Sequence, residues 1–409
     1  MLFSASMKFL FLNYEYPPIG GGASTATEAI LRAWKEDSEV EVHLITSGLG
    51  SEYERMDLGG SIFVHRMPIG KDASRLHSQP MRDILTYSWR AWRFSRTFIR
   101  EENKRKSFDA TLAFFTIPCG FLAYLIERRF GIPFVVSLRG ADVPGFSEKY
   151  DTFYIFAKPF VRFLWRRARA VIPNSIGIRS LAEKTSPGQP MRIIENGVDT
   201  VTFAPDDKKK PDSPVIFLST SRLTPRKGIH FLIEAFAVAL KESPVPLELW
   251  LIGEGEQKPE LQARVAELGI DGQVKFLGRI EHDRLVDYYR QAHIFVLPSK
   301  NEGMSNSALE ALACGLPLVV SGTGGMQELV TEGENGCFID PEDTAAFARA
   351  LSDLAASPDR IRTFGIESRR RAEARGWRQV ATRFKDVLES VSRPSEEKKK
   401  RKLGIKKGR

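Results

Sequence analysis

Short apolar segments alternate with longer amphipathic segments along most of this chain. In the first half, the segments with the length and composition of strands are 8–13, 40–46, 62–66, 110–115, 134–138 and 170–173. Strands that are apolar on both faces and separated by helices are typical of parallel sheets covered by helices on both sides. The pattern therefore predicts a doubly wound α/β domain.

The same pattern begins again after a polar stretch, residues 204–214, which carries charges and three prolines. The strands expected after it are 215–220, 247–252, 274–277, 294–298, 318–320 and 336–339, and the last helices are expected at about 343–356, 358–374 and 377–391. We predict two Rossmann-like domains, 7–203 and 215–375, joined by a linker at 204–214 and facing each other across a cleft. Ligands of such folds bind beyond the carboxyl ends of the strands. Helix 376–391 is expected to return to the first domain.

Charge is concentrated at one end of the chain. The whole sequence has 60 Lys and Arg against 51 Asp and Glu, but residues 398–409 alone contain eight Lys or Arg and no acid. We predict a basic disordered tail at 392–409 and a loose extension at 1–6. Without residues 398–409 the balance is 52 to 51, so the body is nearly neutral. A non-catalytic nucleic-acid binder, which the total charge suggests, is thus disfavoured, and no nucleic-acid partner is expected.

Residues 110–126 form an uncharged run of 17 residues, the lower limit for a transmembrane helix. Because Pro118 and Gly120 interrupt it, we expect a strand, a turn and a buried helix instead. The three cysteines are far apart, and the six histidines show no metal-ligand spacing. These features favour a protein of the reducing cytoplasm without a disulfide framework or a zinc site.

Three segments at the ends of strands have the composition of anion sites. Gly20–Gly22 follow the first strand and precede a helix expected near Ser24, so their backbone is suited to approach an anion, although a tight turn is an equal alternative. Arg222 and Lys227 follow the first strand of the second half. They are suited to clamp a diphosphate, although loop cations of this kind are more often simply solvated.

The third segment, residues 298–325, is the most informative. Glu302 follows a strand, and a helix is expected from about Ser305 with Glu310 in its second turn. The N-terminus of a helix favours an anion, so a carboxylate at 302 is expected to accept hydrogen bonds, for example from hydroxyl groups. The alternative is that both glutamates are surface acids that complement the helix dipole.

Together these motifs resemble those of the GT-B-fold retaining glycosyltransferases of family 4. The resemblance extends over about residues 7–391 and rests most on Glu302 and Glu310, with seven residues between them, followed by Ala-Cys-Gly-Leu-Pro and Gly324-Gly325. Supporting motifs are Arg222 with Lys227, Asn196-Gly197-Val198-Asp199, and Pro-Pro-Ile-Gly-Gly-Gly after the first strand.

The resemblance implies roles for individual residues. Arg222 and Lys227 would hold the diphosphate of the donor, and Glu302 would accept hydrogen bonds from its sugar. Backbone N–H groups of 303–306 would support the phosphates or sugar, Glu310 the ribose, and Arg279 the base. The expected catalytic residues are thus Arg222, Lys227 and Glu302, and the expected donor-binding residues are Gly21, Gly22, Arg139, Asp142, Asn196, Arg279, Gly303, Met304, Ser305, Asn306 and Glu310.

One position departs from the family pattern. Arg139, in Leu-Arg-Gly-Ala-Asp, stands where many relatives have a histidine that contacts the transferred sugar. A guanidinium does not serve as a base, so we expect Arg139 to contact a sugar hydroxyl, an acidic sugar or a phosphate of the acceptor. Asp142 is expected either to orient Arg139 or to cap the following segment.

The activity implied by the resemblance is transfer of a sugar, with retention of anomeric configuration, from a nucleotide-diphosphate sugar to an acceptor. A sugar, a polyprenyl-linked or a lipid-linked acceptor is expected, in the synthesis of cell-surface glycans or glycolipids. The alternative is a nucleotide-sugar epimerase of the same fold. Because the sequence contains no Asp-x-Asp motif, we expect neither a metal nor another cofactor.

A last pattern concerns membranes. In a helix over 82–100, Arg82, Arg93, Arg96 and Arg100 fall on one stripe around Trp89, and the opposite side is expected to hold Ile84, Leu85, Ala91, Trp92, Phe98 and Ile99. Residues 156–169 are a second aromatic and basic stretch. An ordinary solvated face is the favoured explanation. The alternative hypothesis is peripheral contact with an anionic membrane, at the inner face of the cell membrane.

Overall fold

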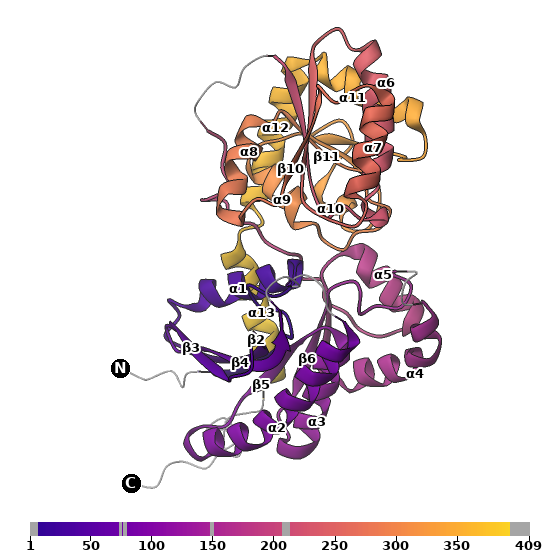
Figure 1. Cartoon of the computed structure of the whole chain (residues 1–409). Helices are drawn as coiled ribbons and strands as arrows, with labels where there is room; N and C mark the ends of the chain where they lie inside the picture. Colours follow the sequence, from indigo (N-terminus) through magenta and orange to yellow (C-terminus); the bar gives the residue numbers. More distant parts are fainter. Residues whose placement is uncertain (1–6, 73–75, 77–79, 148–150, 207–212, 393–409) are drawn as a thin grey trace. The chain divides into compact units, whose positions relative to one another are not determined.

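The computed structural model describes residues 7–72, 76, 80–147, 151–206 and 213–392 (Figure 1). The predicted extension at 1–6, most of the predicted linker and all but the first residue of the predicted tail lie outside these residues. The chain forms two compact units. The C-terminal unit comprises Ser175–Gly177 and Glu195–Gln379, and the N-terminal unit comprises the other described residues. Helix 377–391 thus begins in one unit and, from Val380 onward, belongs to the other.

The N-terminal unit is built on a seven-stranded sheet with the order β3-β4-β2-β1-β5-β6-β7. Its strands are β1 (Met7–Leu12), β2 (Val40–Leu49), β3 (Glu54–Gly59), β4 (Ile62–Lys71), β5 (Ala110–Phe114), β6 (Phe134–Leu138) and β7 (Ala170–Pro173). All neighbours are parallel except β3, which pairs antiparallel with β4. Sequence reasoning missed β3 because this edge strand is polar and largely exposed, without the apolar pattern of a buried strand.

Helices cover both faces of this sheet (Figure 1). They are α1 (Gly22–Trp34), α2 (Met81–Arg105), α3 (Phe121–Phe130), α4 (Asp151–Arg167), α5 (Ile176–Thr185) and α13 (Trp377–Val391). Trp34 of α1 packs on Phe11, and Phe384 of α13 packs on Phe114. In α13 the buried residues recur every three or four positions, so the helix turns one apolar face toward the unit.

The C-terminal unit has a six-stranded sheet with the order β10-β9-β8-β11-β12-β13, and all its strands are parallel. The strands are β8 (Val215–Thr220), β9 (Leu247–Ile252), β10 (Val274–Gly278), β11 (Ile294–Leu297), β12 (Leu318–Ser321) and β13 (Gly336–Ile339). The helices are α6 (Ile229–Glu242), α7 (Lys258–Leu268), α8 (Leu285–Gln291), α9 (Asn306–Ala313), α10 (Met326–Leu329), α11 (Thr344–Ala355) and α12 (Pro358–Glu373). Separate apolar clusters fill the two sides of the sheet. The predicted fold class, two Rossmann-like parallel sheets, is confirmed.

Each sheet has one point where successive connections leave in opposite directions, and ligands of such folds bind there. In the N-terminal unit it lies between β1 and β5, and in the C-terminal unit between β8 and β11. Arg222 and Lys227 follow β8, and Glu302 follows β11. The topology of the C-terminal sheet therefore brings together three residues that are far apart in sequence.

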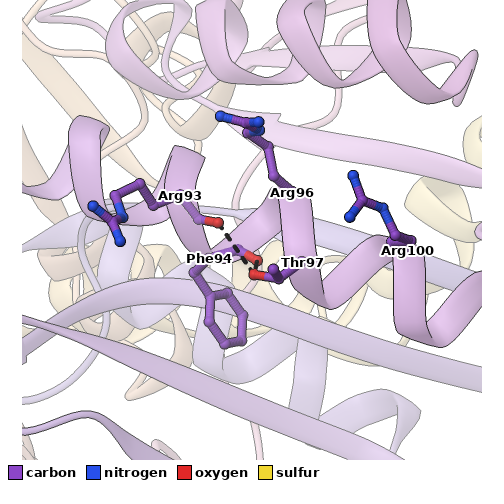
Figure 2. A pocket seen from close by; sticks show the side chains of 5 residues that line it. All are labelled: Arg93, Phe94, Arg96, Thr97 and Arg100. Carbon is purple, nitrogen blue, oxygen red and sulfur yellow. Dashed lines mark hydrogen bonds between the residues drawn. The ribbon is translucent and has the colours of Figure 1, made fainter.

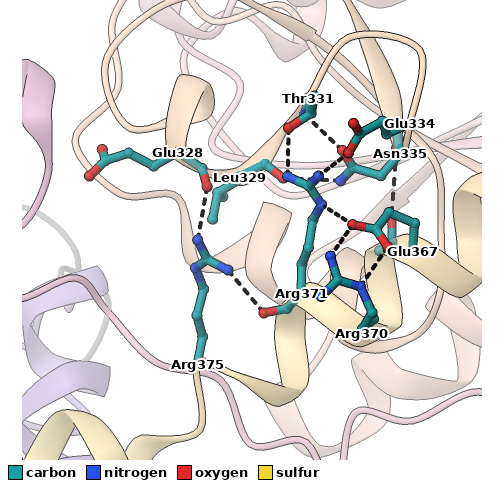
Figure 3. A network of polar contacts seen from close by, with 10 residues as sticks. Glu328, Leu329, Thr331, Glu334, Asn335, Glu367, Arg370, Arg371 and Arg375 are labelled. Atoms are coloured by element: carbon teal, nitrogen blue, oxygen red, sulfur yellow. Dashed lines mark hydrogen bonds and ion pairs between the residues drawn. The ribbon is translucent and has the colours of Figure 1, made fainter.

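Arginines fasten α12 to the loops beside β13 (Figure 3). Arg371 donates to Glu334 (2.6 Å), Glu367 (2.7 Å) and Thr331 (2.8 Å). Arg375, just after α12, donates to the backbone carbonyl of Glu328 (3.0 Å) and to the carboxylate of Glu195 (3.2 Å). These contacts fix both ends of the C-terminal unit's chain, near residues 195 and 375, to its body.

The uncharged run 110–126 forms β5, a short helical turn (Thr116–Gly120) and the start of α3, as the sequence predicts. No helix within the described residues combines the length and the hydropathy needed to cross a membrane.

Candidate functional site

The candidate site begins with the turn that follows β8. Pro225–Lys227 form one turn of 3-10 helix, which ends at Gly228 with a φ of +67°. A Cβ at Gly228 would lie 2.2 Å from the carbonyl oxygen of Pro298, so this close approach to the end of β11 requires glycine. Arg226 donates to the carbonyl of Asn301 (2.8 Å), and its own carbonyl accepts from the N–H of Lys300 (2.9 Å). The turn after β8 and the loop after β11 are thus one structure.

Lys227 and Glu302 form an ion pair across this junction. Their side chains are only 11% and 8% exposed. Burial by itself raises the pKa of Glu302, but the charges of Lys227 and Arg226 outweigh it, so the net shift is downward and Glu302 stays ionised. Burial lowers the pKa of Lys227, and the neighbouring charges of Arg226 and Arg222 lower it further. Two cations, Lys227 and Arg226, therefore act on a single carboxylate, and the exposed Arg222 lies near enough to act on Lys227, so the cluster has an excess of positive charge.

The N-terminus of α9 lies next to Glu302 in the chain. The hydroxyl of Ser305 caps α9 by accepting the N–H of Ala308 (3.3 Å), and Gly303, Met304 and Ser305 are buried. The loop lies directly against Gly324-Gly325. A Cβ at Gly324 would be 1.7 Å from the carbonyl oxygen of Glu302, and the N–H of Gly325 donates to the carbonyl of Gly303 (2.7 Å). The glycine pair thus allows the 302–305 loop to lie flat at the helix end, where partial positive charge favours an anion.

Glu310 is held by two residues that sequence reasoning missed. Tyr289 of α8 donates its hydroxyl to one carboxylate oxygen (3.0 Å), and the Nε2 of His282 lies 2.9 Å from the other. Tyr289 also donates to the carbonyl of Ser307 (3.2 Å), which ties α8 to the first turn of α9. No spacing in the sequence connects 282 or 289 with 310, because the contacts arise from the packing of α8, and of the short 3-10 helix His282–Arg284 before it, against α9.

Asn196 also belongs to this part of the site. Its side-chain amide donates to Oδ1 of Asn306 (2.8 Å) and to the carbonyl of Met304 (3.4 Å). Arg279, the expected base-contacting residue, is exposed directly after β10, the edge strand of the sheet. The structure therefore gathers Asn196 with the 302–306 loop, whereas Arg279 follows a strand that β9 separates from β8.

Four expected donor-binding residues lie in the N-terminal unit. Helix α1 begins at Gly22 with Gly21 as its N-cap, two residues before the start predicted near Ser24. The N–H of Gly21 donates to the carboxylate of Glu15 (3.2 Å), and a Cβ at Gly21 would meet no atom within 4 Å. Among the described residues, there is therefore room for a side-chain atom at Gly21.

Arg139 and Asp142 occupy the turn after β6. Asp142 accepts the backbone N–H groups of Arg139 (2.8 Å), Gly140 (3.1 Å) and Thr116 (2.9 Å), which holds the turn against the end of β5. Burial raises the pKa of Asp142 despite these hydrogen bonds. The guanidinium of Arg139 lies 4.7 Å from the ring centre of Phe114, and burial lowers its pKa to about 10, so it remains charged at neutral pH.

A second cluster of charged residues, this one in the N-terminal unit, stabilises the fold and is not a candidate ligand site. Among the described residues, Glu41, His43 and Glu102 are close enough together to hold a metal ion. The ammonium group of Lys8 already lies 2.9 Å from Glu41 and 2.6 Å from Glu102, so a cation of the chain itself occupies this position. The hydrogen bond from His43, and then Lys8, lowers the pKa of Glu41 to about 2.

Two family models match the chain over most of its length. The model "Glycosyl transferase 4-like domain" matches residues 21–197, and the model "Glycosyl transferases group 1" matches residues 201–375. The chain belongs to the GT-B glycosyltransferases of family 4. The family assignment made from Glu302, Glu310 and the accompanying motifs is therefore confirmed, while the roles of the individual site residues stay predictions.

Relatives of known name match different shares of this chain. A D-inositol 3-phosphate glycosyltransferase of Streptomyces avermitilis is 34% identical over 211 residues, which are 48% of this chain and 46% of that protein. The chain thus matches about half the length of such curated relatives. A GDP-mannose-dependent alpha-(1-6)-phosphatidylinositol monomannoside mannosyltransferase of Mycolicibacterium smegmatis is 27% identical over 397 residues, covering 93% of this chain and 97% of that protein.

Solved structures of other proteins share the fold. Sucrose-phosphate synthase of Thermosynechococcus elongatus superposes with a TM-score of 0.78 at 21% identity, covering 94% of this chain and 99% of that chain. HepE of Anabaena, solved in complex with UDP-glucose, superposes with a TM-score of 0.71 at 21% identity over 94% of this chain and all of that chain. At this identity the likeness establishes the GT-B architecture only.

Proposed function

We propose that this protein is a retaining glycosyltransferase that moves a sugar from a nucleotide-diphosphate sugar to an acceptor. The observation that carries the proposal is the cluster of Lys227 and Arg226 around the buried Glu302, with the exposed Arg222 near Lys227, at the switch point of the C-terminal sheet and beside the N-terminus of α9. An excess of buried positive charge needs an anion, and a diphosphate supplies it.

The proposed chemistry uses this charge directly. When the bond between the anomeric carbon and the diphosphate breaks, negative charge grows on the leaving oxygen. Lys227, Arg222 and the N–H groups at the start of α9 would stabilise that charge. Electrostatic catalysis is strongest when such groups are already in place and need not reorganise during the reaction. Glu302 would exchange part of its contact with Lys227 for hydroxyls of the sugar.

Retention is proposed to proceed by attack from the same side as the departing diphosphate. A double displacement needs a carboxylate free to attack the anomeric carbon. Glu302 and Glu310 are both engaged in the described structure, the first by Lys227 and the second by Tyr289 and His282. The departing diphosphate would then receive the proton of the acceptor hydroxyl.

The relatives support a nucleotide-diphosphate donor and an acceptor of the cell surface. One relative is named as GDP-mannose-dependent and acts on a phosphatidylinositol mannoside, another is named as a lipopolysaccharide core glycosyltransferase of Rhizobium meliloti, and HepE was solved with UDP-glucose. We infer a role in the synthesis of cell-surface glycans or glycolipids. Divalent metal is proposed to be unnecessary, because Arg222, Lys227 and α9 supply the positive charge that a metal would supply.

A thermal-shift screen of nucleotides tests the donor class. Ligands that bind only the folded state raise its melting temperature, so one nucleoside diphosphate and its sugar are expected to stabilise the protein while monophosphates and free sugars do not. The variant Lys227→Met is expected to lose the shift, and the matched control Lys300→Met, at an exposed ion pair of the same unit, to keep it. Equal shifts in both variants would contradict the site. Turnover of the donor to an isomer without any acceptor would indicate an epimerase instead.

A further inference from the structure

The exposed side of α2 combines arginines with large apolar side chains. Arg82, Leu85, Trp89, Arg93, Arg96 and Arg100 follow one another at intervals of three or four residues, so they share one face of the helix. Leu85 and Trp89 are 61% and 58% exposed. Sequence reasoning placed Leu85 on the opposite, buried side. Because Leu85 is exposed, the arginine-bearing face of α2 carries more apolar surface than the sequence predicts.

Three of these arginines line a pocket of about 400 Å³ with Phe94 and Thr97. Figure 2 shows Arg93, Arg96 and Arg100 spread around the pocket, while Phe94 points away from Arg96, and Phe94 packs against the apolar core. The single acid between residues 81 and 100 is Asp83, and Lys71 neutralises it at 2.8 Å. The pocket is therefore positively charged and suited to the phosphate of a lipid headgroup.

Helix α4 exposes an unusually large apolar face. Ile155 and Phe156 are 70% and 80% exposed, and Phe153, Phe160 and Phe163 are 37–45% exposed. Residues 152–167 contain no acid, and the exposed Arg166 and Arg167 lie at the C-terminal end of this face. Large exposed apolar patches on folded domains mark interaction surfaces.

Helix α3 lies between α2 and α4 and packs on both (Figure 1). On the α4 side, Phe121 packs against Phe160 with ring centres 5.4 Å apart, and Tyr124 packs against Phe163 at 5.2 Å. The three helices thus cover the same face of the N-terminal sheet, and the two exposed stripes belong to one side of the unit.

We propose that this side docks on an anionic phospholipid bilayer. The α2–α4 surface is defined by Arg93, Arg96 and Arg100 of α2 and by Phe153, Ile155, Phe156, Phe160 and Phe163 of α4. Aromatic and aliphatic side chains insert at the interface of a bilayer, and arginines bind its phosphates. A second copy of this chain fits less well as the partner. Residues 81–100 and 152–167 together carry nine Lys or Arg, so the same surfaces of two copies would repel each other.

Flotation of the full chain with vesicles tests the proposal independently of catalysis. Vesicles of phosphatidylcholine with phosphatidylglycerol are expected to bind the protein, and vesicles of phosphatidylcholine alone to bind it far more weakly. The triple variant Arg93→Gln, Arg96→Gln, Arg100→Gln is expected to bind about a hundredfold more weakly, since each cation near an anionic surface contributes about 1 kcal/mol. Its matched control replaces three exposed arginines of the C-terminal unit by glutamine: Arg349, Arg360 and Arg362. The control should bind like the unchanged protein.

The apolar face has its own test. The variant Ile155→Ser, Phe156→Ser is expected to bind at least about tenfold more weakly, because it removes apolar area that would leave water. A blue shift of fluorescence on vesicle binding should depend on the exposed Trp89 and be lost in Trp89→Phe. The proposal is overturned if the protein does not bind anionic vesicles, or if the triple arginine variant and its control bind them equally well. It is overturned as well if truncation after Ser392 alone abolishes binding. It is also overturned if ultracentrifugation shows a dimer that the serine variant dissociates.

Discussion

Replacing Glu302 with glutamine should change stability, diphosphate binding and turnover in three distinguishable ways. The substitution keeps the shape of the side chain and removes the charge that faces Lys227. Lys227 would then be buried without a counter-ion. We expect the free energy of unfolding to fall, the affinity for a nucleoside diphosphate without sugar to rise, and turnover of the complete donor to fall.

The magnitudes follow from burial and charge. Removing one partner of a buried ion pair destabilises a protein by about 3 kcal/mol, because the other charge is left uncompensated. For an anion about 6 Å from the lost carboxylate, the repulsion removed is about 3 kcal/mol at an effective dielectric constant of about 20, and solvent screening leaves roughly half. That corresponds to about tenfold tighter diphosphate binding. Losing the charged acceptor for sugar hydroxyls, about 1.5–3 kcal/mol, should lower kcat/KM of the donor by about ten- to a hundredfold.

Urea denaturation, calorimetric titration with the diphosphate and steady-state kinetics measure the three effects. The control is Glu342→Gln, which removes an exposed glutamate 3.7 Å from Lys300 and should change stability by less than about 0.5 kcal/mol. The double variant Lys227→Met, Glu302→Gln should be more stable than Glu302→Gln alone and should no longer bind the diphosphate. Weaker diphosphate binding by Glu302→Gln, or unchanged stability, would refute the idea that Glu302 neutralises Lys227 until a phosphate binds.

Three further outcomes follow from the same structure. Arg222→Ala should lower kcat/KM about a hundredfold, or about 3 kcal/mol in the barrier, with little change in melting temperature because this side chain is exposed; an equal loss in Arg349→Ala would contradict it. Burial, together with the charge of Glu195, raises the pKa of Glu328 to about 7. Its ionisation is therefore suppressed in the folded state, and its contribution to stability is complete below the ordinary pKa of 4.5 and is lost as the pH rises through about 7. After screening, urea denaturation at about pH 5 and about pH 8 should reveal about 1 kcal/mol of this dependence, which Glu328→Gln abolishes. Chelation of divalent metal by EDTA should leave turnover unchanged, and restoration of a lost activity by added Mg²⁺ or Mn²⁺ would refute the metal-free scheme.

The sequence predicts the frame of the molecule well because buried parallel strands have a strong signature. Eleven of the thirteen strands in the described part of the chain begin at the predicted residue, since continuous apolar runs are bounded by turns. Its failures are on the surface. The polar strand β3 is stabilised by pairing with β4 and not by burial. Leu85 is an apolar residue whose side chain is exposed, so a rule that places apolar residues on the buried face of a helix misplaces it.

The contact between Lys227 and Glu302 in the candidate site was predictable because both residues follow strands. Lys227 and Glu302 are 75 residues apart, and the parallel sheet places β8 beside β11 and so brings them into contact. His282 and Tyr289 were missed because their contact with Glu310 depends on how α8 packs against α9. Helix packing is set by side-chain complementarity over many positions and leaves no local motif.

Two buried ionic clusters in the described part of the chain illustrate how the proposed ligand site differs from a structural cluster. Around Lys8, two carboxylates face one ammonium group, and His43 and His65 complete the hydrogen bonds, so every charge is satisfied within the unit. Around Glu302 the ratio is reversed, because two cations, Lys227 and Arg226, act on one carboxylate and a third, Arg222, acts on Lys227. Folding alone gains nothing from gathering like charges, since each added cation lowers the pKa of Lys227 and raises the free energy of the folded state. We propose that a diphosphate carrying a sugar neutralises this excess, because the 302–305 loop, the end of α9 and the neighbouring carboxylate offer groups for both parts of such a ligand.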